Sequence, residues 1–270
     1  MNNSLEQDKL EIQKQWDSDP CGAATVQDQV PESLEFYRAI RKHRYEEYGP
    51  WFDEVMRFDD WRNKDVLEVG VGLGSDHYRF AVKGNRMTAL DLSQEHLRHT
   101  VKHIGLEGLE TKPNYGDAEA MPFDDNAFDV VYSFGVLHHT PNTEKSIAEV
   151  HRVLKPGGTA IIGLYHRDSY FYWLTTLLIS GVLKGKLFKK GYRKLMSEIE
   201  YRAESDSAMP IVKVYSRWQT RRLFSKFASV ELKICHVQPG IFQNGAPWVR
   251  GVLEKYFGWF GWYVIAFAKK

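Results

Sequence analysis

The stretch DVLEVGVGLGSD, residues 65–76, constrains the fold of this chain more than any other segment. It begins with Val66, Leu67 and Val69, interrupted only by Glu68, and such a near-continuous apolar run is typical of a buried parallel strand. Glycines then occupy the alternate positions 70, 72 and 74. They permit a sharp turn and let a ligand approach the backbone closely, at the start of a helix whose free N–H groups carry a positive dipole end. The stretch therefore predicts a ligand site at the carboxyl end of a strand.

Strand and helix patterns alternate over much of the remaining chain. Apolar runs predict strands at 65–69, 86–93, 111–116, 128–134, 159–166, 228–237 and 262–270. Helical patterns are found at 74–82, 94–104, 143–154 and 217–227, with Ser93 as an N-cap and KPGG at 155–158 as a stop signal. This alternation predicts an α/β fold, a Rossmann-like and mostly parallel sheet with helices on both faces. The last strand follows its predecessor without a crossover helix of normal length, so we expect it to pair antiparallel.

Two regions depart from this rhythm. Residues 1–60 contain short helical patterns at 5–16, 32–49 and 51–58, and we expect them to form an N-terminal helical lid. Trp16 either packs on the main domain or belongs to this lid over the site. Residues 167–216 interrupt the alternation of strands and helices. We expect them to form a cap insertion in a domain of residues 61–270. Within this insertion, the segment 169–183 is apolar but too short to span a bilayer, and six basic residues follow at 184–194. The segment 169–194 is therefore either a buried cap helix with a solvated basic turn or a membrane-surface contact.

Composition narrows the class of partner. The chain has 270 residues and a formal net charge of +1, which gives no case for a nucleic-acid partner. Its two cysteines, Cys21 and Cys235, form no disulfide framework, so a reducing compartment is expected. The polar N-terminus and the lack of an 18-residue apolar run predict neither a secretory signal nor a transmembrane helix. We expect a cytoplasmic protein, peripheral to a membrane if the basic segment contacts lipid; the sequence carries no signal for its oligomeric state.

The acids at the strand ends indicate the kind of ligand. A dinucleotide fingerprint would place a third glycine at position 75, which is Ser75 here, and Glu68 would repel a pyrophosphate. The same Glu68 suits a ligand with an ammonium or sulfonium group. Asp91 ends the second strand, where its carboxylate can accept hydrogen bonds from ribose hydroxyls, although a helix-approach cap is an alternative role. Asp117 ends the third strand, and ligands of open α/β sheets bind outside these ends.

With these motifs, the chain resembles class I S-adenosylmethionine-dependent methyltransferases, and within them the ubiquinone and menaquinone biosynthesis group. The matching motifs are LEVGVGLGSD, ALDLS, GDAEAMPFDDNAFDVVYSFGVLHHTPN and EVHRVLKPGGTAIIG, over roughly residues 64–165. The resemblance implies a seven-stranded sheet with the last strand antiparallel and S-adenosylmethionine as the cofactor. It also implies a set of cofactor contacts: Glu68, Gly70, Gly72 and Gly74 at the methionine part, Asp91 at the ribose, Leu92, Asp117 and Ala118 at the adenine, and Ser133, Phe134 and Gly135 near the sulfonium.

Candidate catalytic residues follow the fourth and fifth strands. His138 and His139 are suited to act as a general base, with polar loop residues as the alternative, and Tyr165 and His166 either contact the substrate or are structural. In some relatives the segment of the two histidines reads E-x-x-E-H and can bind a divalent metal. The matching positions here are Gly135, His138 and His139, so both acids are missing and no metal is expected.

Three classes of function remain open from the sequence. The first is methyl transfer to a small, and in one version lipophilic, molecule by in-line displacement, in which the protein holds the nucleophile, methyl group and sulfur in line. The second is transfer of another group derived from the same cofactor, such as aminocarboxypropyl or carboxymethyl. The third is a non-catalytic cofactor-binding module, which the intact glycine loop and the three acids disfavour. Aromatic residues at 242–263 are expected to be mainly core, with an apolar wall of the acceptor site as the alternative.

Overall fold

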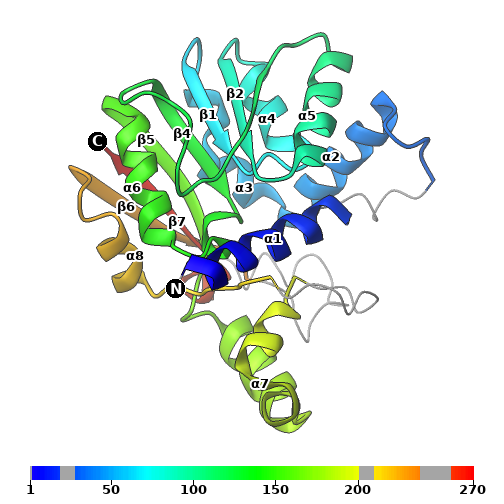
Figure 1. Ribbon diagram of the computed structural model, residues 1–270, viewed down its shortest axis with the longest axis vertical. Coiled ribbons are helices and arrows are strands. Elements are labelled where there is room, and N and C mark those ends of the chain that lie inside the picture. Colours follow the sequence, from blue (N-terminus) through cyan, green and yellow to red (C-terminus); the bar gives the residue numbers. More distant parts are fainter. Residues whose placement is uncertain (1, 19–27, 201–209, 238–256) are drawn as a thin grey trace.

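A seven-stranded sheet forms the centre of the molecule (Figure 1). The computed structural model describes residues 2–18, 28–200, 210–237 and 257–270. The strands are β1 (Asp65–Val69), β2 (Arg86–Asp91), β3 (Lys112–Tyr115), β4 (Phe128–Phe134), β5 (Leu154–Tyr165), β6 (Ser229–Cys235) and β7 (Tyr263–Lys269). They are arranged in the order β3-β2-β1-β4-β5-β7-β6. The predicted α/β sheet is confirmed, because β1 to β5 pair in parallel and β7 runs antiparallel to both β5 and β6.

Helices connect the parallel strands near the predicted positions. They are α4 (Ser75–Ala81), α5 (Gln94–Leu106), α6 (Thr143–Val153) and, before β6, α8 (Arg217–Leu223). The hydroxyl of Ser93 accepts the backbone N–H of His96 at 3.1 Å, which confirms Ser93 as the N-cap of α5. Asn142 caps α6 in the same way. Helix α8 ends four residues earlier than predicted.

Alternate residues of the central strands face two separate cores. Val66 of β1, Val130 of β4 and Ile161 of β5 face one core, while their neighbours Leu67 and Val131 face the other. The first core includes residues of α3, η2 and α4, and the second includes residues of α6 and the segment after α8. Burial on both faces explains why these strands are apolar throughout.

Helix α6 ends at Val153, just before KPGG, as the stop signal predicted, but the segment itself lies within β5 and is not a separate turn. Strand β5 already begins at Leu154, and its register against β4 shifts between Phe128 and Val130. Gly157 has φ 76°, and its N–H donates to the carbonyl of Lys270 at 2.9 Å. A bulge therefore accommodates the proline and the glycine pair, because the adjacent chain end supplies the hydrogen bonds that a free turn would lack.

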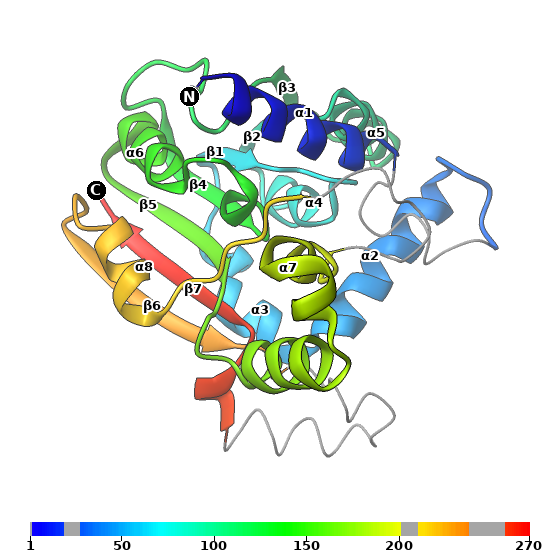
Figure 2. The same cartoon turned by 60° about the horizontal axis from the view of Figure 1, so that its bottom comes forward.

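The N-terminal residues form α1 (Asn2–Ser18), α2 (Leu34–Tyr48), α3 (Pro50–Met56) and the short η2 (Phe58–Asp60). Helix α2 buries Phe36, Tyr37 and Ile40, and Gly49 with φ 77° ends it as expected. The phenol of Tyr37 contacts the imidazole of His99 on α5 at 2.8 Å. Helix α1 also lies beside α5 (Figure 2).

The insertion after β5 folds into two packed helical segments, η4 (Phe171–Leu183) and α7 (Lys186–Ser197). Figures 1 and 2 show them standing apart from the sheet. Phe171 anchors them to the core, because its ring lies 4.9 Å from that of Trp262. Among the described residues, no helix combines the length and the apolarity that crossing a membrane requires. The predicted aromatic positions Phe242, Trp248 and Tyr256 lie outside the described residues, as does Cys21.

Candidate active site

A cavity of about 450 Å³ opens at the carboxyl ends of the parallel strands. Eleven predicted site residues line it: Glu68, Gly70, Gly72, Asp91, Leu92, Asp117, Ala118, Phe134, Gly135, His139 and Tyr165. Four do not line it: Gly74, Ser133, His138 and His166. The structure thus brings most of the predicted site residues together, at the place expected for a ligand of an open α/β sheet.

The glycine loop forms one wall of the cavity. Gly70, Gly72 and Gly74 all have positive φ, at 79°, 52° and 77°. A Cβ on Gly70 would lie 2.3 Å from a methyl group of Val136, so no side chain fits there. A Cβ on Gly72 would meet no atom within 4 Å and would project into open space. The loop therefore exposes bare backbone to whatever fills the cavity.

Gly74 and Ser133 support this wall from behind. Gly74 is the N-cap of α4, and a Cβ there would approach the ring of His103 to 3.2 Å. The hydroxyl of Ser133 donates to the carbonyl of Val69 at 2.8 Å and is buried. Both residues position the loop, and neither faces the cavity.

Asp91 joins the loop to α5. Its Oδ2 accepts the N–H of Val71 and its Oδ1 accepts the N–H of Ser93, both at 2.9 Å. The side chain of His96 contacts the same carboxylate, with Nδ1 3.3 Å from Oδ2. The carboxylate is buried yet lines the cavity. It caps the approach to α5 and also faces the cavity, so its role toward a ribose stays a prediction.

Glu68 lies in a buried polar cluster at the other end of the loop. Its Oε2 is 2.8 Å from Nδ1 of His77, and Nε2 of His77 is 2.7 Å from the hydroxyl of Thr111. Burial, reinforced by the charge of Asp76, raises the pKa of Glu68 well above its ordinary value. Burial also lowers the pKa of His77 to about 3. The histidine is therefore neutral, and the cluster favours a cation that would compensate the carboxylate.

Arg44 and Asp76 are site residues that the sequence did not reveal. Both carboxylate oxygens of Asp76 accept from the guanidinium of Arg44, at 3.0 and 2.6 Å, and Tyr45 and Tyr132 add hydroxyl donors at 3.0 and 2.7 Å. Arg44 comes from α2, and its guanidinium lies 5.5 Å from the ring centre of Phe134. No local pattern links a residue of α2 to the first residues of α4, because only the tertiary fold brings them together.

Helix α1 covers the end of the cavity that contains Asp117. The ammonium of Lys9 lies 2.6 Å from Asp117 and 3.3 Å from Glu119. The ring of Trp16 lies 6.2 Å from that of His96 and 6.0 Å from that of His139. Trp16 lines the cavity, as a lid residue would, and it also packs on the main domain.

The predicted catalytic residues lie at or just after the ends of β4 and β5 and separate into two kinds. His139 and Tyr165 line the cavity, and the phenol of Tyr165 donates to Glu200. His138 is fully buried beside Tyr165, with the ring centres 3.8 Å apart. His166 follows β5, is buried, and its Nδ1 contacts the carbonyl of Gly261 at 3.0 Å. Of the four predicted catalytic residues, only His139 and Tyr165 line the cavity and could contact a substrate directly.

The comparisons with known proteins agree with this geometry. Residues 67–162 match the family model described as a methyltransferase domain. Curated relatives include phosphoethanolamine N-methyltransferase 2 of Caenorhabditis elegans, 32% identical over 114 residues, which are 41% of this chain and 26% of that protein. Sterol 24-C-methyltransferase ERG6A of Gibberella zeae is 28% identical over 60% of this chain and 49% of its own. Phthiotriol/phenolphthiotriol dimycocerosates methyltransferase of Mycobacterium tuberculosis is 41% identical over 37% of each chain.

Solved structures extend the likeness beyond the matched segment. A protein of Pyrococcus horikoshii OT3 aligns with a TM-score of 0.55 at 16% identity, covering 95% of this chain and 98% of that one. An S-adenosylmethionine-dependent methyltransferase of Aquifex aeolicus aligns at 0.52 and 14% identity, covering 88% and 98%. The matched segments span only about a quarter to a half of the length of these curated relatives.

The fold is thus the class I S-adenosylmethionine-dependent methyltransferase fold. Residues 67–162 match a methyltransferase domain, and the aligned Aquifex aeolicus structure is that of an S-adenosylmethionine-dependent methyltransferase, which implies S-adenosylmethionine as the cofactor. The narrower resemblance to the ubiquinone and menaquinone group stays a prediction.

Proposed function

We propose that this protein transfers the methyl group of S-adenosylmethionine to a small, lipophilic acceptor. The observation that carries the proposal is one cavity with two chemically different ends. Acids and bare glycine backbone line one end, through Asp91, Glu68 and Gly72. Aromatic side chains, among them Phe134 and Trp262, line the other.

The donor end fits the cofactor in charge and in shape. At two glycines that line the cavity, Gly72 and Gly135, a Cβ would meet nothing within 4 Å, which leaves room for a ligand. Asp91 would accept hydrogen bonds from the ribose, and Glu68 would compensate the ammonium group of the methionine part. Arg44 lies close enough to Glu68 to affect its pKa and would hold the methionine carboxylate. When bound, S-adenosylmethionine supplies a methyl group on a positively charged sulfur.

The acceptor end is apolar except at one polar corner, where His139 and Glu200 line the cavity. Phe134, Tyr165, Trp262 and Tyr263 supply the aromatic surface. The rings of Phe134 and Tyr263 are 4.6 Å apart, and those of Tyr165 and Trp262 are 4.4 Å apart. Such a wall would bind an apolar acceptor and exclude water from the transfer. The names of two relatives point the same way, since one acts on a sterol and another on phthiotriol dimycocerosates.

Calorimetric titration with S-adenosylhomocysteine, and with NAD as the control, tests the donor end. We expect heat and a single site with S-adenosylhomocysteine and no binding of NAD. The acceptor end is tested by incubating the protein with cofactor that carries a labelled methyl group. Three extracts, graded from apolar to polar, serve in turn as the source of acceptor. Label in the apolar extract supports the proposal, whereas cofactor binding with label only in the polar extract refutes the lipophilic acceptor and leaves the donor assignment intact.

We also propose that η4 and α7 contact a membrane surface, from which a lipophilic acceptor would reach the cavity. Large apolar side chains are exposed on this pair: Trp173, Leu178, Val182, Leu183, Phe188 and Tyr192. Leu183 and Phe188, next to the turn between the helices, are 72% and 76% exposed. Lys184 and Lys189 flank them and are also exposed. An apolar tip with a basic rim is typical of peripheral binding to anionic lipid.

Co-sedimentation with anionic and with neutral vesicles tests this contact. Replacing Leu183 and Phe188 together by serine should abolish binding to anionic vesicles. The matched control replaces Trp218 of α8, which is 67% exposed on a different part of the molecule, and should leave binding unchanged. Equal binding of all three proteins would refute the contact.

A further inference from the structure

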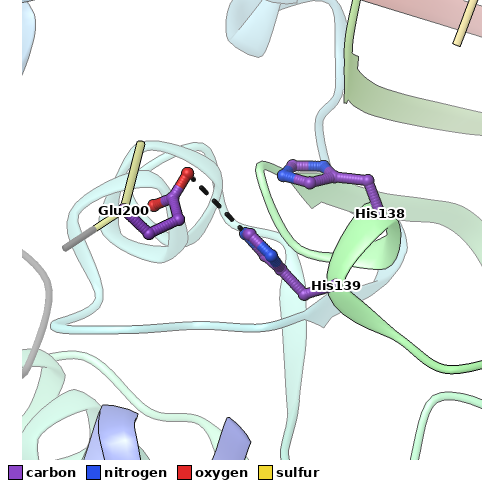
Figure 3. A group of neighbouring side chains, drawn as sticks. All are labelled: His138, His139 and Glu200. Atoms are coloured by element: carbon purple, nitrogen blue, oxygen red, sulfur yellow. Dashed lines mark ion pairs between the residues drawn. The ribbon is translucent and has the colours of Figure 1, made fainter. Parts of the chain in front are cut away.

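Three side chains with metal-binding atoms converge at the polar corner of the acceptor end (Figure 3). His138 and His139 come from the short helix η3 (Leu137–His139) after β4, and Glu200 comes from the chain that follows α7. Their ligand atoms all lie within 4.8 Å of one another. Nε2 of His139 is 4.0 Å from Oε1 of Glu200.

Three imidazole nitrogens of this cluster lack a hydrogen-bond partner among the described residues. Among the described residues, neither nitrogen of His138 has a hydrogen-bond partner, and neither does Nε2 of His139. Both rings are almost completely buried. Buried polar atoms are nearly always paired, and an unpaired group costs roughly 1–3 kcal/mol. Three such atoms beside one carboxylate indicate a ligand.

Neighbouring groups hold the cluster in the form that a metal requires. Nδ1 of His139 lies 2.6 Å from the carbonyl of Ile211 and must therefore carry the proton, which leaves Nε2 with a lone pair toward Glu200. The phenol of Tyr165 donates to Glu200 and orients its carboxylate. Metal-binding histidines and carboxylates are typically fixed by outer hydrogen bonds of this kind.

A second group of potential ligands provides a contrast. Glu32, Glu95 and His99 also lie within 4.8 Å of one another. Their carboxylates, however, accept from Arg98, and Glu32 also pairs with Lys102. Proximity alone therefore does not mark a site, and the unpaired nitrogens distinguish the cluster of His138, His139 and Glu200.

We propose that His138, His139 and Glu200 bind a divalent transition-metal ion of the zinc type at the acceptor end of the cavity. Two imidazoles and one carboxylate are a ligand set that suits Zn²⁺ and similar ions, whereas Mg²⁺ prefers oxygen ligands alone. Ligands of a tetrahedral zinc ion lie roughly 3.3–3.6 Å apart, so the side chains need to close by only about 1 Å. An ion with three protein ligands keeps a position for a further ligand, and His139 and Glu200 line the cavity. An oxygen of the acceptor would bind there.

The carboxylate explains why the sequence predicted no metal. The resemblance considered only Gly135, His138 and His139, where the acids of some relatives are missing. Glu200 is more than sixty residues away along the chain, on the cap insertion. The cap would thus complete the site, and binding of the ion would fix the cap against η3.

Metal binding is tested on the full chain purified without a polyhistidine tag and dialysed against a chelator. Titration with Zn²⁺ should show one ion per chain, and Co²⁺ should give the visible absorption of a four- or five-coordinate site. Even outer-shell changes weaken metal binding by roughly 10–100-fold, so Glu200→Gln and His139→Gln should each weaken it at least tenfold. Glu198→Gln and His151→Gln are the matched controls, because Glu198 pairs with Lys186 and Lys190, and the ring of His151 packs against Phe227 near the end of α6.

The outcomes separate the alternatives. Less than a tenth of an ion per chain refutes the proposal, and so does equal binding by Glu200→Gln and Glu198→Gln. Thermal unfolding of each variant identifies a failure to fold, in which case Glu200→Asp, which keeps the carboxylate, should retain binding in a folded protein. S-adenosylhomocysteine titration of the same samples reports on the donor end separately, so the metal site can fail while the proposed function stands.

Discussion

Replacing Asp91 by asparagine tests both roles of the carboxylate that joins the glycine loop to α5. The wild-type carboxylate accepts the N–H of Val71 on one oxygen and the N–H of Ser93 on the other, both at 2.9 Å. Asparagine offers one acceptor oxygen, so its amide nitrogen would face a second buried donor. Leaving that donor unpaired should cost about 1–3 kcal/mol of the free energy of unfolding.

Cofactor affinity should fall in the same variant. A hydrogen bond from a ribose hydroxyl to an ionised carboxylate contributes roughly 1.5–3 kcal/mol, which corresponds to a Kd about 10- to 100-fold weaker for S-adenosylhomocysteine. Urea unfolding measures the stability loss and calorimetry measures the Kd.

The control for Asp91→Asn is Asp129→Asn, near the amino end of β4 and so at the opposite end of the parallel strands. Asp129 also accepts a backbone N–H, that of Asp65 at 2.8 Å, so its loss should affect stability and leave the Kd unchanged. Unaltered cofactor affinity in Asp91→Asn would refute the assignment of Asp91 to the cofactor and leave it a purely structural residue.

Two further substitutions test the loop and its buried acid. The pKa of Glu68 is raised in the folded protein, so the native state binds this proton more tightly than the unfolded state and loses stability as the pH rises above the ordinary value near 4.5. Glu68→Gln should therefore be more stable than wild type at pH 8 and closer to it at pH 5 in urea unfolding, and an equal difference at both values would contradict the raised pKa. Gly70→Ala should lose more stability than Gly108→Ala, because both glycines have positive φ but only the new Cβ of residue 70 would overlap Val136. A Val136→Ala change should recover part of this difference, and calorimetric melting would detect it; no recovery would rule out the overlap.

The sequence predicted the sheet well because its signals are local. Each central strand is buried on both faces and so reads as an apolar run, and Ser93 is followed directly by the helix it caps. The bulge at Gly157 was missed for the opposite reason. Proline and paired glycines normally end an element, and only the adjacent end of β7 supplies the hydrogen bonds that keep this segment in β5.

The site residues divide along the same line. Glu68, Gly72 and Asp91 could be predicted because parallel strands end at one edge, so residues at strand ends meet without further information. Arg44 and Glu200 could not, because each reaches the cavity through the packing of a separate helix. His138 and His166 lie at strand ends as well, but both are buried and do not line the cavity.

The two halves of the proposed reaction depend on different parts of the fold. The donor end is built by short turns that follow β1 and β2, so its geometry depends on the sheet and on few long-range contacts. The acceptor end depends on the insertion, because Glu200 follows α7, which packs on η4, and η4 is held to the core by Phe171 against Trp262. Changes in the cap should therefore alter which acceptor is bound while S-adenosylmethionine binding persists, and changes at Asp91 should affect every acceptor equally.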